Sequence, residues 1–120
     1  MVTPEHVQRW CEDYIAAWRS YDPVAIRALF TDDARYAYEP YSAPLEGVDA
    51  ILESWVADPD EPGSWEATYA PGLIEGDRAI AKGETRYANG KVFSNLYELE
   101  FAADGRCSSF VEWYVLHKQD

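Results

Sequence analysis

Residues 58–64 read Asp-Pro-Asp-Glu-Pro-Gly-Ser, and the spacing of the hydrophobic residues changes from one side of this stretch to the other. Before it, most hydrophobic residues recur every three or four positions, which is the period of an amphipathic helix. After it, they alternate with polar residues, which is the period of a half-buried strand. Helices followed by strands predict the α+β class, with the helices packed on one face of an antiparallel sheet.

Three helices are expected before this stretch, and two of them carry a clear start signal. Thr3 followed by Pro4 combines a residue that caps a helix N-terminus with one that suits the first helical position. Asp22 and Pro23 repeat this pair, and residues 31–33 are expected to end the second helix. The expected elements are helices at 4–20, 23–30 and 48–57, with a short strand at 35–39 between the second and the third.

Four longer strands are expected after the stretch. Short turns of sequence Glu-Gly-Asp, Ala-Asn-Gly and Ala-Asp-Gly separate them, and turns of this kind join antiparallel neighbours. A chain of 120 residues suits one domain, because two halves would each be too small to bury a core. We therefore expect one domain over residues 1–120, with strands at 65–74, 78–87, 92–102 and 106–117.

The charge of the chain limits its partners. Ten Lys and Arg residues stand against twenty-two Asp and Glu, which gives a formal net charge of −12. Such a chain repels phosphate backbones and anionic lipids, so neither a nucleic acid nor a membrane is expected as a partner. The N-terminal residues hold no apolar run typical of a signal peptide, which favours a cytoplasmic protein. Cys11 and Cys107 are expected to be reduced core residues, and a disulfide between them is the less favoured alternative.

The order of elements and several motifs resemble the nuclear transport factor 2-like superfamily, and within it the SnoaL-like and ketosteroid-isomerase branch. The motifs are Thr3-Pro4-Glu5-His6, Tyr14-x-Ala16-Ala17, Asp22, Ala28-Leu29-Phe30-x-Asp32-Asp33-Ala34, Asn95-x-Tyr97-x-x-x-Phe101, Asp104-Gly105-Arg106 and Glu112-Trp113. The resemblance spans nearly the whole chain and implies a cystatin-like cone, in which three N-terminal helices and a curved antiparallel sheet surround a cavity. Because this fold hosts isomerases, dehydratases, cyclases and plain binding proteins, it does not determine the chemistry.

The resemblance also implies candidate catalytic residues. In the steroid isomerases, a tyrosine on the first helix donates a hydrogen bond to the enolate, an aspartate on the first strand moves the proton, and a protonated aspartate on a late strand is the second donor. Tyr14 matches the tyrosine, whereas Tyr38 and Tyr97 stand where the two aspartates should be. Glu39 is adjacent to the position of the base and precedes Pro40, so a one-residue bulge would aim it into the cavity.

The last two strands supply a further candidate. Alternation places Asn95 and Tyr97 on one face of their strand, and Phe110, Glu112 and Tyr114 on one face of the next. By resemblance, these faces look into the cone. Glu112 would then be a carboxylate in an apolar setting, where burial raises the pKa and suits the group to acid–base work. The alternative is a solvent-facing glutamate on an exposed strand.

Other positions have two interpretations each. Tyr14 fits a core tyrosine as well as a cavity residue. Trp18 and Trp55 lie near the ends of two helices that flank the mouth of the cone, where they would either line it or pack. Glu84 and Arg86 would form a polar pair if they faced inward, but an outward, solvated face is favoured.

The leading hypothesis is a protein that holds a small, mainly apolar organic molecule. Its polar contacts would be Tyr14, Asn95, Tyr97 and Glu112, and its chemistry would be proton transfer beside a carbonyl group. His6 and His117 are the only histidines and neither has a spaced partner, so no metal or cofactor is expected. The rival hypothesis is a non-catalytic ligand-binding or dimeric interaction domain. A homodimer that pairs through the outer face of the sheet is expected under both.

Overall fold

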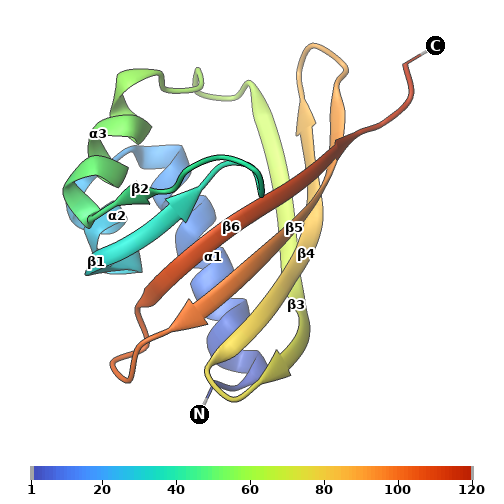
Figure 1. Cartoon of the computed structure of the whole chain (residues 1–120). Helices are drawn as coiled ribbons and strands as arrows, with labels where there is room; N and C mark the ends of the chain where they lie inside the picture. The colour runs from blue at the N-terminus through green and yellow to red at the C-terminus, as the bar shows by residue number, and fades with distance from the viewer. Residues whose placement is uncertain (1, 120) are drawn as a thin grey trace.

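The computed structural model describes residues 2–119, which form three helices and one six-stranded sheet (Figure 1). The helices are α1 (Pro4–Ser20), α2 (Pro23–Leu29) and α3 (Val48–Ala57). The strands are β1 (Phe30–Ala37), β2 (Leu45–Glu46), β3 (Trp65–Glu75), β4 (Arg78–Tyr87), β5 (Val92–Phe101) and β6 (Cys107–Leu116). In space the strands follow the order β2-β1-β6-β5-β4-β3, and every neighbouring pair is antiparallel except β1 and β6. The predicted α+β class and cone architecture are confirmed.

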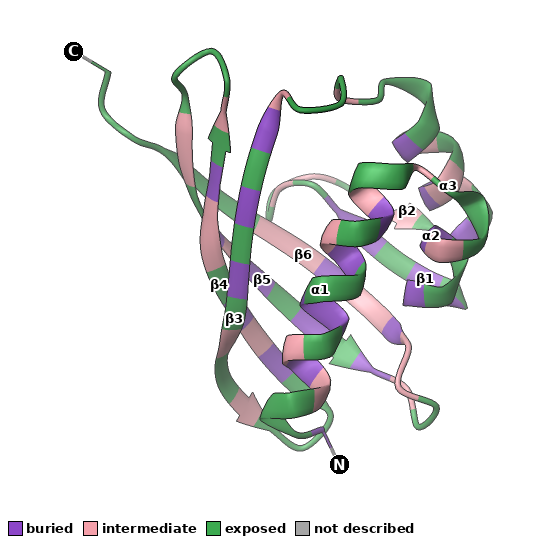
Figure 2. Cartoon of the chain, turned by 180° about the vertical axis from the view of Figure 1, so that it is seen from behind, coloured by how far each residue is buried: buried purple, intermediate pink, exposed green. Residues whose placement is uncertain are grey.

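Helix α1 lies across one face of the sheet and turns its buried side toward the strands (Figure 2). The Thr3 side chain accepts a hydrogen bond from the His6 backbone N–H at 3.1 Å, as expected for a capping residue. The helix ends where Tyr21 adopts a left-handed conformation and bonds back to the Ala17 carbonyl. The predicted limits of this helix, residues 4–20, are therefore correct.

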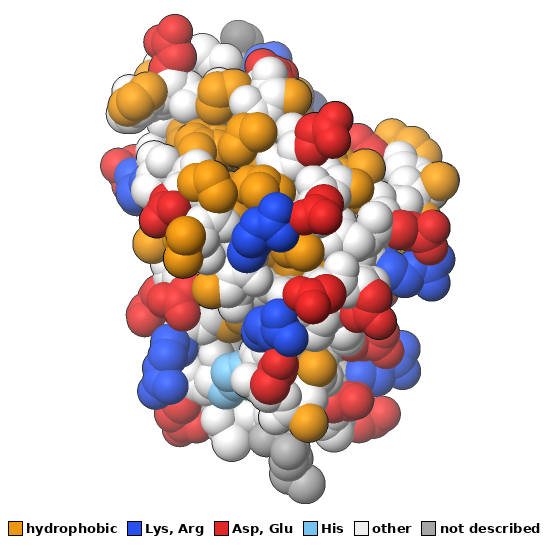
Figure 3. Space-filling view, turned by 90° about the vertical axis from the view of Figure 1, so that its left-hand side faces the viewer, with side chains coloured by type: hydrophobic (Ala, Val, Ile, Leu, Met, Phe, Trp, Pro, Cys, Tyr) orange, Lys and Arg blue, Asp and Glu red, His pale blue; other side chains and the backbone are white. Residues whose placement is uncertain are grey.

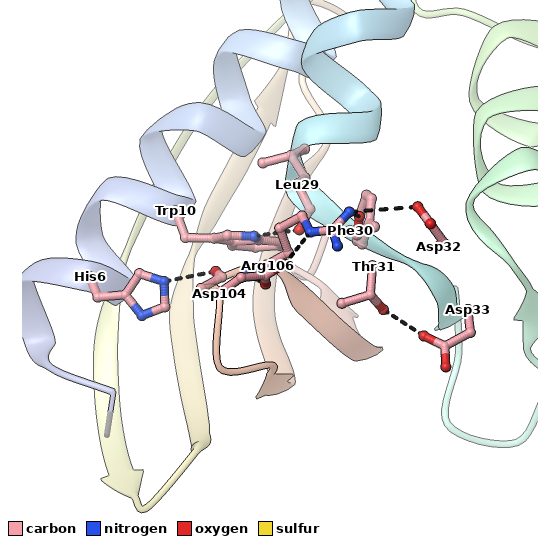
Figure 4. Close-up of polar contacts among 10 residues, drawn as sticks. His6, Trp10, Leu29, Phe30, Thr31, Asp32, Asp33, Asp104 and Arg106 are labelled. Carbon is pink, nitrogen blue, oxygen red and sulfur yellow. Dashed lines mark hydrogen bonds and ion pairs between the residues drawn. The ribbon is translucent and has the colours of Figure 1, made fainter.

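The boundary between α2 and β1 differs from the prediction. Helix α2 ends at Leu29 instead of Phe30, and the strand occupies Phe30–Ala37 instead of residues 35–39. Contacts with distant parts of the chain fix this boundary (Figure 4). The Trp10 indole N–H donates to the Leu29 carbonyl at 3.0 Å, and Phe30 pairs with Cys107 in the parallel ladder to β6. Tertiary contacts thus override the helical spacing of the local sequence.

The turn between β5 and β6 is tied to both α1 and β1 at the end of the molecule shown in Figure 4. The His6 Nε2 atom hydrogen-bonds the Gly105 carbonyl at 2.9 Å. Arg106 pairs with Asp104 at 2.8 Å and with Asp32 at 3.6 Å. Gly105 has a φ of +90°, a conformation that side chains other than glycine rarely adopt. These contacts close the end of the cone opposite the 58–64 loop.

The surface mixes charges of both signs. On the side that carries α2 and α3, hydrophobic side chains gather in the upper part, with acidic and basic side chains interspersed around and below them (Figure 3). Exposed ion pairs join neighbouring elements, such as Arg27 with Asp49 at 2.7 Å between α2 and α3. Exposed pairs of this kind each contribute about 0–1 kcal/mol, so they are minor terms in stability. Across residues 2–119, no helix is both long enough and apolar enough to cross a membrane.

Both cysteines lie in the core, as predicted. Cys11 on α1 and Cys107 at the start of β6 are fully buried and are not bonded to each other. Burial raises the pKa of each thiol to about 12. The reactive thiolate is therefore scarce at neutral pH.

Candidate ligand cavity

A cavity of about 520 Å³ lies between the helices and the inner face of the sheet. Ligand sites in proteins have volumes of about 300–1,000 Å³, so this cavity is large enough for a small organic molecule. The sequence-predicted residues that line it are Tyr14, Trp18, Tyr38, Trp55, Asn95, Tyr97, Glu112 and Tyr114. Residues that the sequence analysis did not propose also line it: Tyr21, Tyr36, Ser54, Asp58, Asp60, Tyr69, Thr85, Tyr87 and Phe93.

Glu112 is the carboxylate on the inner face of the sheet. It lies on β6 opposite Tyr97, and the Asn95 side-chain N–H group donates to its Oε2 atom at 3.0 Å. The pKa of Glu112 is raised to about 7. Burial is the largest cause of this rise, the Asn95 hydrogen bond opposes it, and the charge of Glu39 adds to it. Glu112 therefore exchanges its proton close to neutral pH, which is the range that a general acid–base residue needs.

Asn95 is held in place by a chain of hydrogen bonds along the cavity wall. The Thr85 hydroxyl donates to the Asn95 Oδ1 atom at 2.9 Å, which leaves the Asn95 amide hydrogens to face Glu112. Because Thr85 has a single hydroxyl hydrogen, the Tyr69 hydroxyl must be the donor in their 2.7 Å contact. Thr85 and Asn95 are buried, and these bonds satisfy their polar atoms.

A glycine on the neighbouring strand makes room for Tyr69. Gly83 lies opposite Tyr69 in the β3–β4 ladder and opposite Asn95 in the β4–β5 ladder. A Cβ atom at this position would collide with the Thr68 carbonyl oxygen and with the Tyr69 ring. The glycine thus lets the ring lie against the backbone of β4, from where its hydroxyl reaches Thr85.

Three phenols are buried near the base of the cavity. The hydroxyl groups of Tyr14 and Tyr36 contact each other at 3.1 Å, and Tyr97 packs 5.6 Å from the Tyr14 ring, measured between ring centroids. Burial above all raises the pKa of all three well above the usual value, so they stay neutral and keep their hydrogens. In the Tyr14–Tyr36 pair one hydroxyl donates to the other, which leaves one hydrogen free for a ligand.

Two of the predicted site residues do not line the cavity. Glu39 lies in the loop after β1, where its carboxylate accepts a 2.6 Å hydrogen bond from the Ser42 hydroxyl. The irregularity in the β1–β6 ladder falls between Phe30 and Arg35, so no bulge turns Glu39 inward. Phe110 belongs to the core behind the cavity, where its ring stacks 4.3 Å from Tyr36. It supports the cavity wall without lining it.

The remaining ambiguous residues are also resolved by their positions. Tyr14 is both a core residue and a lining residue, since it is buried and borders the cavity. The Tyr38 hydroxyl contacts Ser54 on α3 at 2.7 Å. Glu84 and Arg86 form an ion pair at 3.1 Å on the outer face of β4, which is the arrangement favoured from the sequence.

The mouth of the cavity is bordered by the 58–64 loop, which is fastened to α1. The Trp18 indole N–H donates to the Asp60 carboxylate at 2.9 Å, and the Asp60 backbone N–H donates to the Tyr21 hydroxyl at 2.8 Å. The Trp18 ring stacks on Trp65 with centroids 3.5 Å apart. These contacts hold Asp60 in place, and Asp58 and Asp60 both line the cavity, the first as an exposed and the second as a half-buried residue at its rim.

Within residues 2–119, no group of three or more His, Cys, Asp or Glu side chains is arranged to hold a metal ion.

Comparisons with known proteins agree with this architecture. One similar structure is an NTF-2-like protein of unknown function from Burkholderia xenovorans, with a TM-score of 0.74, 18% identity, and coverage of 97% of this chain and 88% of that chain. A putative ketosteroid isomerase from Kribbella flavida has a TM-score of 0.72 and 19% identity, over 98% of this chain and 83% of that one. An NTF2-like protein of unknown function from Mesorhizobium loti has a TM-score of 0.67 and 18% identity, over 96% of this chain and 95% of that one.

Identities this low show a shared fold and nothing about activity. A comparison with curated proteins finds no match. The family model of the SnoaL-like domain matches residues 11–115, which is most of the chain. The protein is a member of the SnoaL-like domain family.

Proposed function

We propose that this protein binds a small, mainly apolar organic molecule in the cavity and transfers a proton on it, at a carbon beside a carbonyl group, without a cofactor. The observation that supports this proposal most strongly is Glu112, a carboxyl group with a pKa of about 7 that faces a cavity rich in neutral phenols. A group that gains and loses its proton near neutral pH is suited to both halves of such a reaction.

In the first half, the Glu112 carboxylate takes a proton from the carbon, and the electrons of the broken C–H bond move onto the carbonyl oxygen. Glu112 becomes a neutral acid and the substrate becomes an enolate. Hydrogen bonds from buried phenols stabilise the new negative charge more than they stabilise the ketone. The candidates are Tyr97 and the free hydrogen of the Tyr14–Tyr36 pair. In the second half, Glu112 returns the proton to the same carbon or to another carbon of the enolate.

Asn95 is a positioning residue in this scheme. Its amide donates to one carboxylate oxygen of Glu112, and the bond with Thr85 prevents the amide from turning around. The second carboxylate oxygen, Oε1, accepts no hydrogen bond from the side chains of residues 2–119, which leaves it to take the substrate proton. Holding a base in this way contributes to catalysis because little reorganisation is needed during the reaction.

A deuterium-exchange experiment tests the proposal. The protein is incubated with 2-tetralone in D2O, and the loss of the protons beside the carbonyl is followed by NMR. The Glu112→Gln variant keeps the shape and should slow protein-catalysed exchange by about 10²–10⁴-fold. Glu84→Gln, on the outer face of the same sheet, is the matched control and should exchange like the unmodified protein. If Glu112→Gln leaves the rate unchanged while the ketone still binds, the rival hypothesis of a non-catalytic binding protein replaces this one.

A further inference from the structure

The charges that border the cavity all have the same sign. Among the described residues, the cavity is lined by three acidic side chains, Asp58, Asp60 and Glu112, and by no Lys, Arg or His. Asp58 and Asp60 are at the rim on the 58–64 loop, and Glu112 is further in, on β6. The site therefore has a negative potential that no basic side chain in its wall offsets.

The neutral part of the lining is mostly aromatic. Eleven of the seventeen lining residues found in residues 2–119 are Tyr, Trp or Phe, although such residues make up only 15% of the sequence. The faces of aromatic rings carry partial negative charge and attract cations, and sites that recognise ammonium groups combine several such rings. The aromatic rings and the carboxylates of this cavity thus both favour a positively charged ligand.

Nearby basic side chains are engaged outside the cavity. Arg19 lies over the ring of Trp65 at 4.8 Å and pairs with Glu66 at 2.9 Å. Arg86 pairs with Glu84 on the outer face of β4. Trp65, which stacks on the lining residue Trp18, thus already has a guanidinium group against its ring.

The proposed reaction adds a requirement. When Glu112 takes a proton, a negative charge moves to the substrate oxygen, where neutral phenols are the donors in the proposed scheme. No basic residue of the cavity wall, within residues 2–119, stabilises that charge. A positive charge on the substrate would add a counter-charge to the hydrogen bonds that the neutral phenols donate. We propose that the ligand carries an ammonium group, held at the rim by Asp58, Asp60 and aromatic rings, with an apolar body that reaches inward to Glu112. This inference rests on the proposed use of the cavity and specifies its ligand class.

A pair of equal-sized probes tests the charge preference without any chemistry. Benzyltrimethylammonium is a permanent cation, and neopentylbenzene is its neutral carbon isostere. Binding is measured at pH 8 by quenching of tryptophan fluorescence and by NMR shifts. We expect the cation to bind at least tenfold more tightly than the isostere. The preference should shrink in 1 M salt, because the Debye length then falls to about 3 Å.

Matched variants assign the preference to the rim. Asp58→Asn with Asp60→Asn removes two charges, while the side-chain amide oxygen introduced at position 60 can still accept the Trp18 hydrogen bond. This double variant should lose most of the tenfold preference. The control variant combines Asp77→Asn with Glu75→Gln, where β3 turns into β4. It removes the same amount of charge away from the cavity and should keep the preference for the cation.

Equal binding of the two probes, tighter binding of the neutral one, or no binding of the cation at about 10 mM overturns the inference. None of these results depends on proton transfer, so a failed exchange experiment and a failed ammonium preference are distinguishable. Slow exchange with a clear cation preference would reject only the catalytic step. Fast exchange without the preference would reject only the ammonium ligand.

Discussion

Asn95 and Glu112 are joined across β5 and β6 by a hydrogen bond of 3.0 Å from the Asn95 amide to the Glu112 carboxylate. The bond favours the ionised form of Glu112, whereas burial favours the neutral form, and the pKa of about 7 shows that burial is the larger effect. Single substitutions at or near this pair should therefore shift the protonation equilibrium of Glu112, or remove it, with a predictable effect.

Replacing Glu112 with Gln should change the pH dependence of stability. The folded pKa is about 7 and the ordinary value is 4.5, so the folded state holds its proton more tightly than the unfolded state. The protonated form therefore favours folding below pH 4.5, and this contribution is lost as the pH rises to about 7. When the pH is raised from 4 to 8, the free energy of unfolding of Glu112→Gln should therefore rise by about 1–3 kcal/mol relative to that of the unmodified protein.

Urea unfolding at the two pH values measures this difference. Glu98→Gln, on the outer face of β5, is the control and should show no such gain. A constant difference between Glu112→Gln and the unmodified protein at both pH values would mean that Glu112 is not buried as described.

Replacing Thr85 with Val should break the hydrogen-bond chain at its centre. The Asn95 oxygen and the Tyr69 hydroxyl would both lose a buried partner, which should cost about 1–3 kcal/mol of unfolding free energy. With its amide free to turn, Asn95 would stabilise the Glu112 carboxylate less, so the pKa of Glu112 should rise. Carbon-13 NMR of the Glu112 carboxyl group measures that shift.

Thr68→Val is the control for this substitution, since Thr68 is exposed on β3 and points away from the cavity. It should leave the Glu112 titration unchanged. If Thr85→Val lowers the pKa or leaves it unchanged, Thr85 does not orient the amide.

The two cysteines should be reduced and slow to react. Burial raises the pKa of both thiols to about 12, and neither side chain is accessible in the folded state. We expect a thiol reagent to modify neither cysteine quickly in the native protein and to find two thiols after denaturation. Finding none after denaturation would indicate a disulfide instead.

The outer face of the sheet should pair two copies of the chain. Trp113 is 48% exposed and Val115 is 66% exposed on the outer side of β6, next to the partly exposed Leu96 on β5. An apolar strip of this kind is typical of an interface. Sedimentation at tens of micromolar, an order of magnitude suited to a stable interface, should show a dimer. Val115→Asp should produce a monomer, whereas Val24→Asp on α2 should remain dimeric. A monomeric unmodified protein would contradict the prediction.

The sequence predicts the fold well because most elements have a strong local signal. Start signals at Thr3-Pro4 and Asp22-Pro23 and the glycine turns between the strands mark most of the element boundaries. There are two exceptions: the short strand β2 (Leu45–Glu46), which was not predicted, and the first strand, β1. Phe30 fits the helical spacing of α2, and only its contacts with β6 and Arg106 make it part of a strand.

The same boundary explains why one lining residue of the cavity, Tyr36, was missed. With the strand placed at residues 35–39, the alternation of Ala34 and Tyr36 on the inner face is hidden, so Tyr36 is not proposed. A strand start at Phe30 would have revealed it. Asp58 and Asp60 lie in a loop, where no periodicity indicates direction, and only the bonds to Trp18 and Tyr21 place the loop at the rim. Glu112 was accessible to prediction because the period of two along a strand places it on the same face as Phe110 and Tyr114.

The single hydroxyl hydrogen of Thr85 has a consequence for ligand orientation. Because Tyr69 donates its own hydrogen to Thr85, it presents only lone pairs to the cavity, whereas the Tyr14–Tyr36 pair presents a hydrogen. The two groups are close together, since the rings of Tyr14 and Tyr69 lie 6.3 Å apart between centroids, yet they offer a ligand opposite hydrogen-bonding groups. A ligand that carries a donor beside an acceptor satisfies both groups in one orientation, and exchanging the two positions sets lone pair against lone pair and hydrogen against hydrogen.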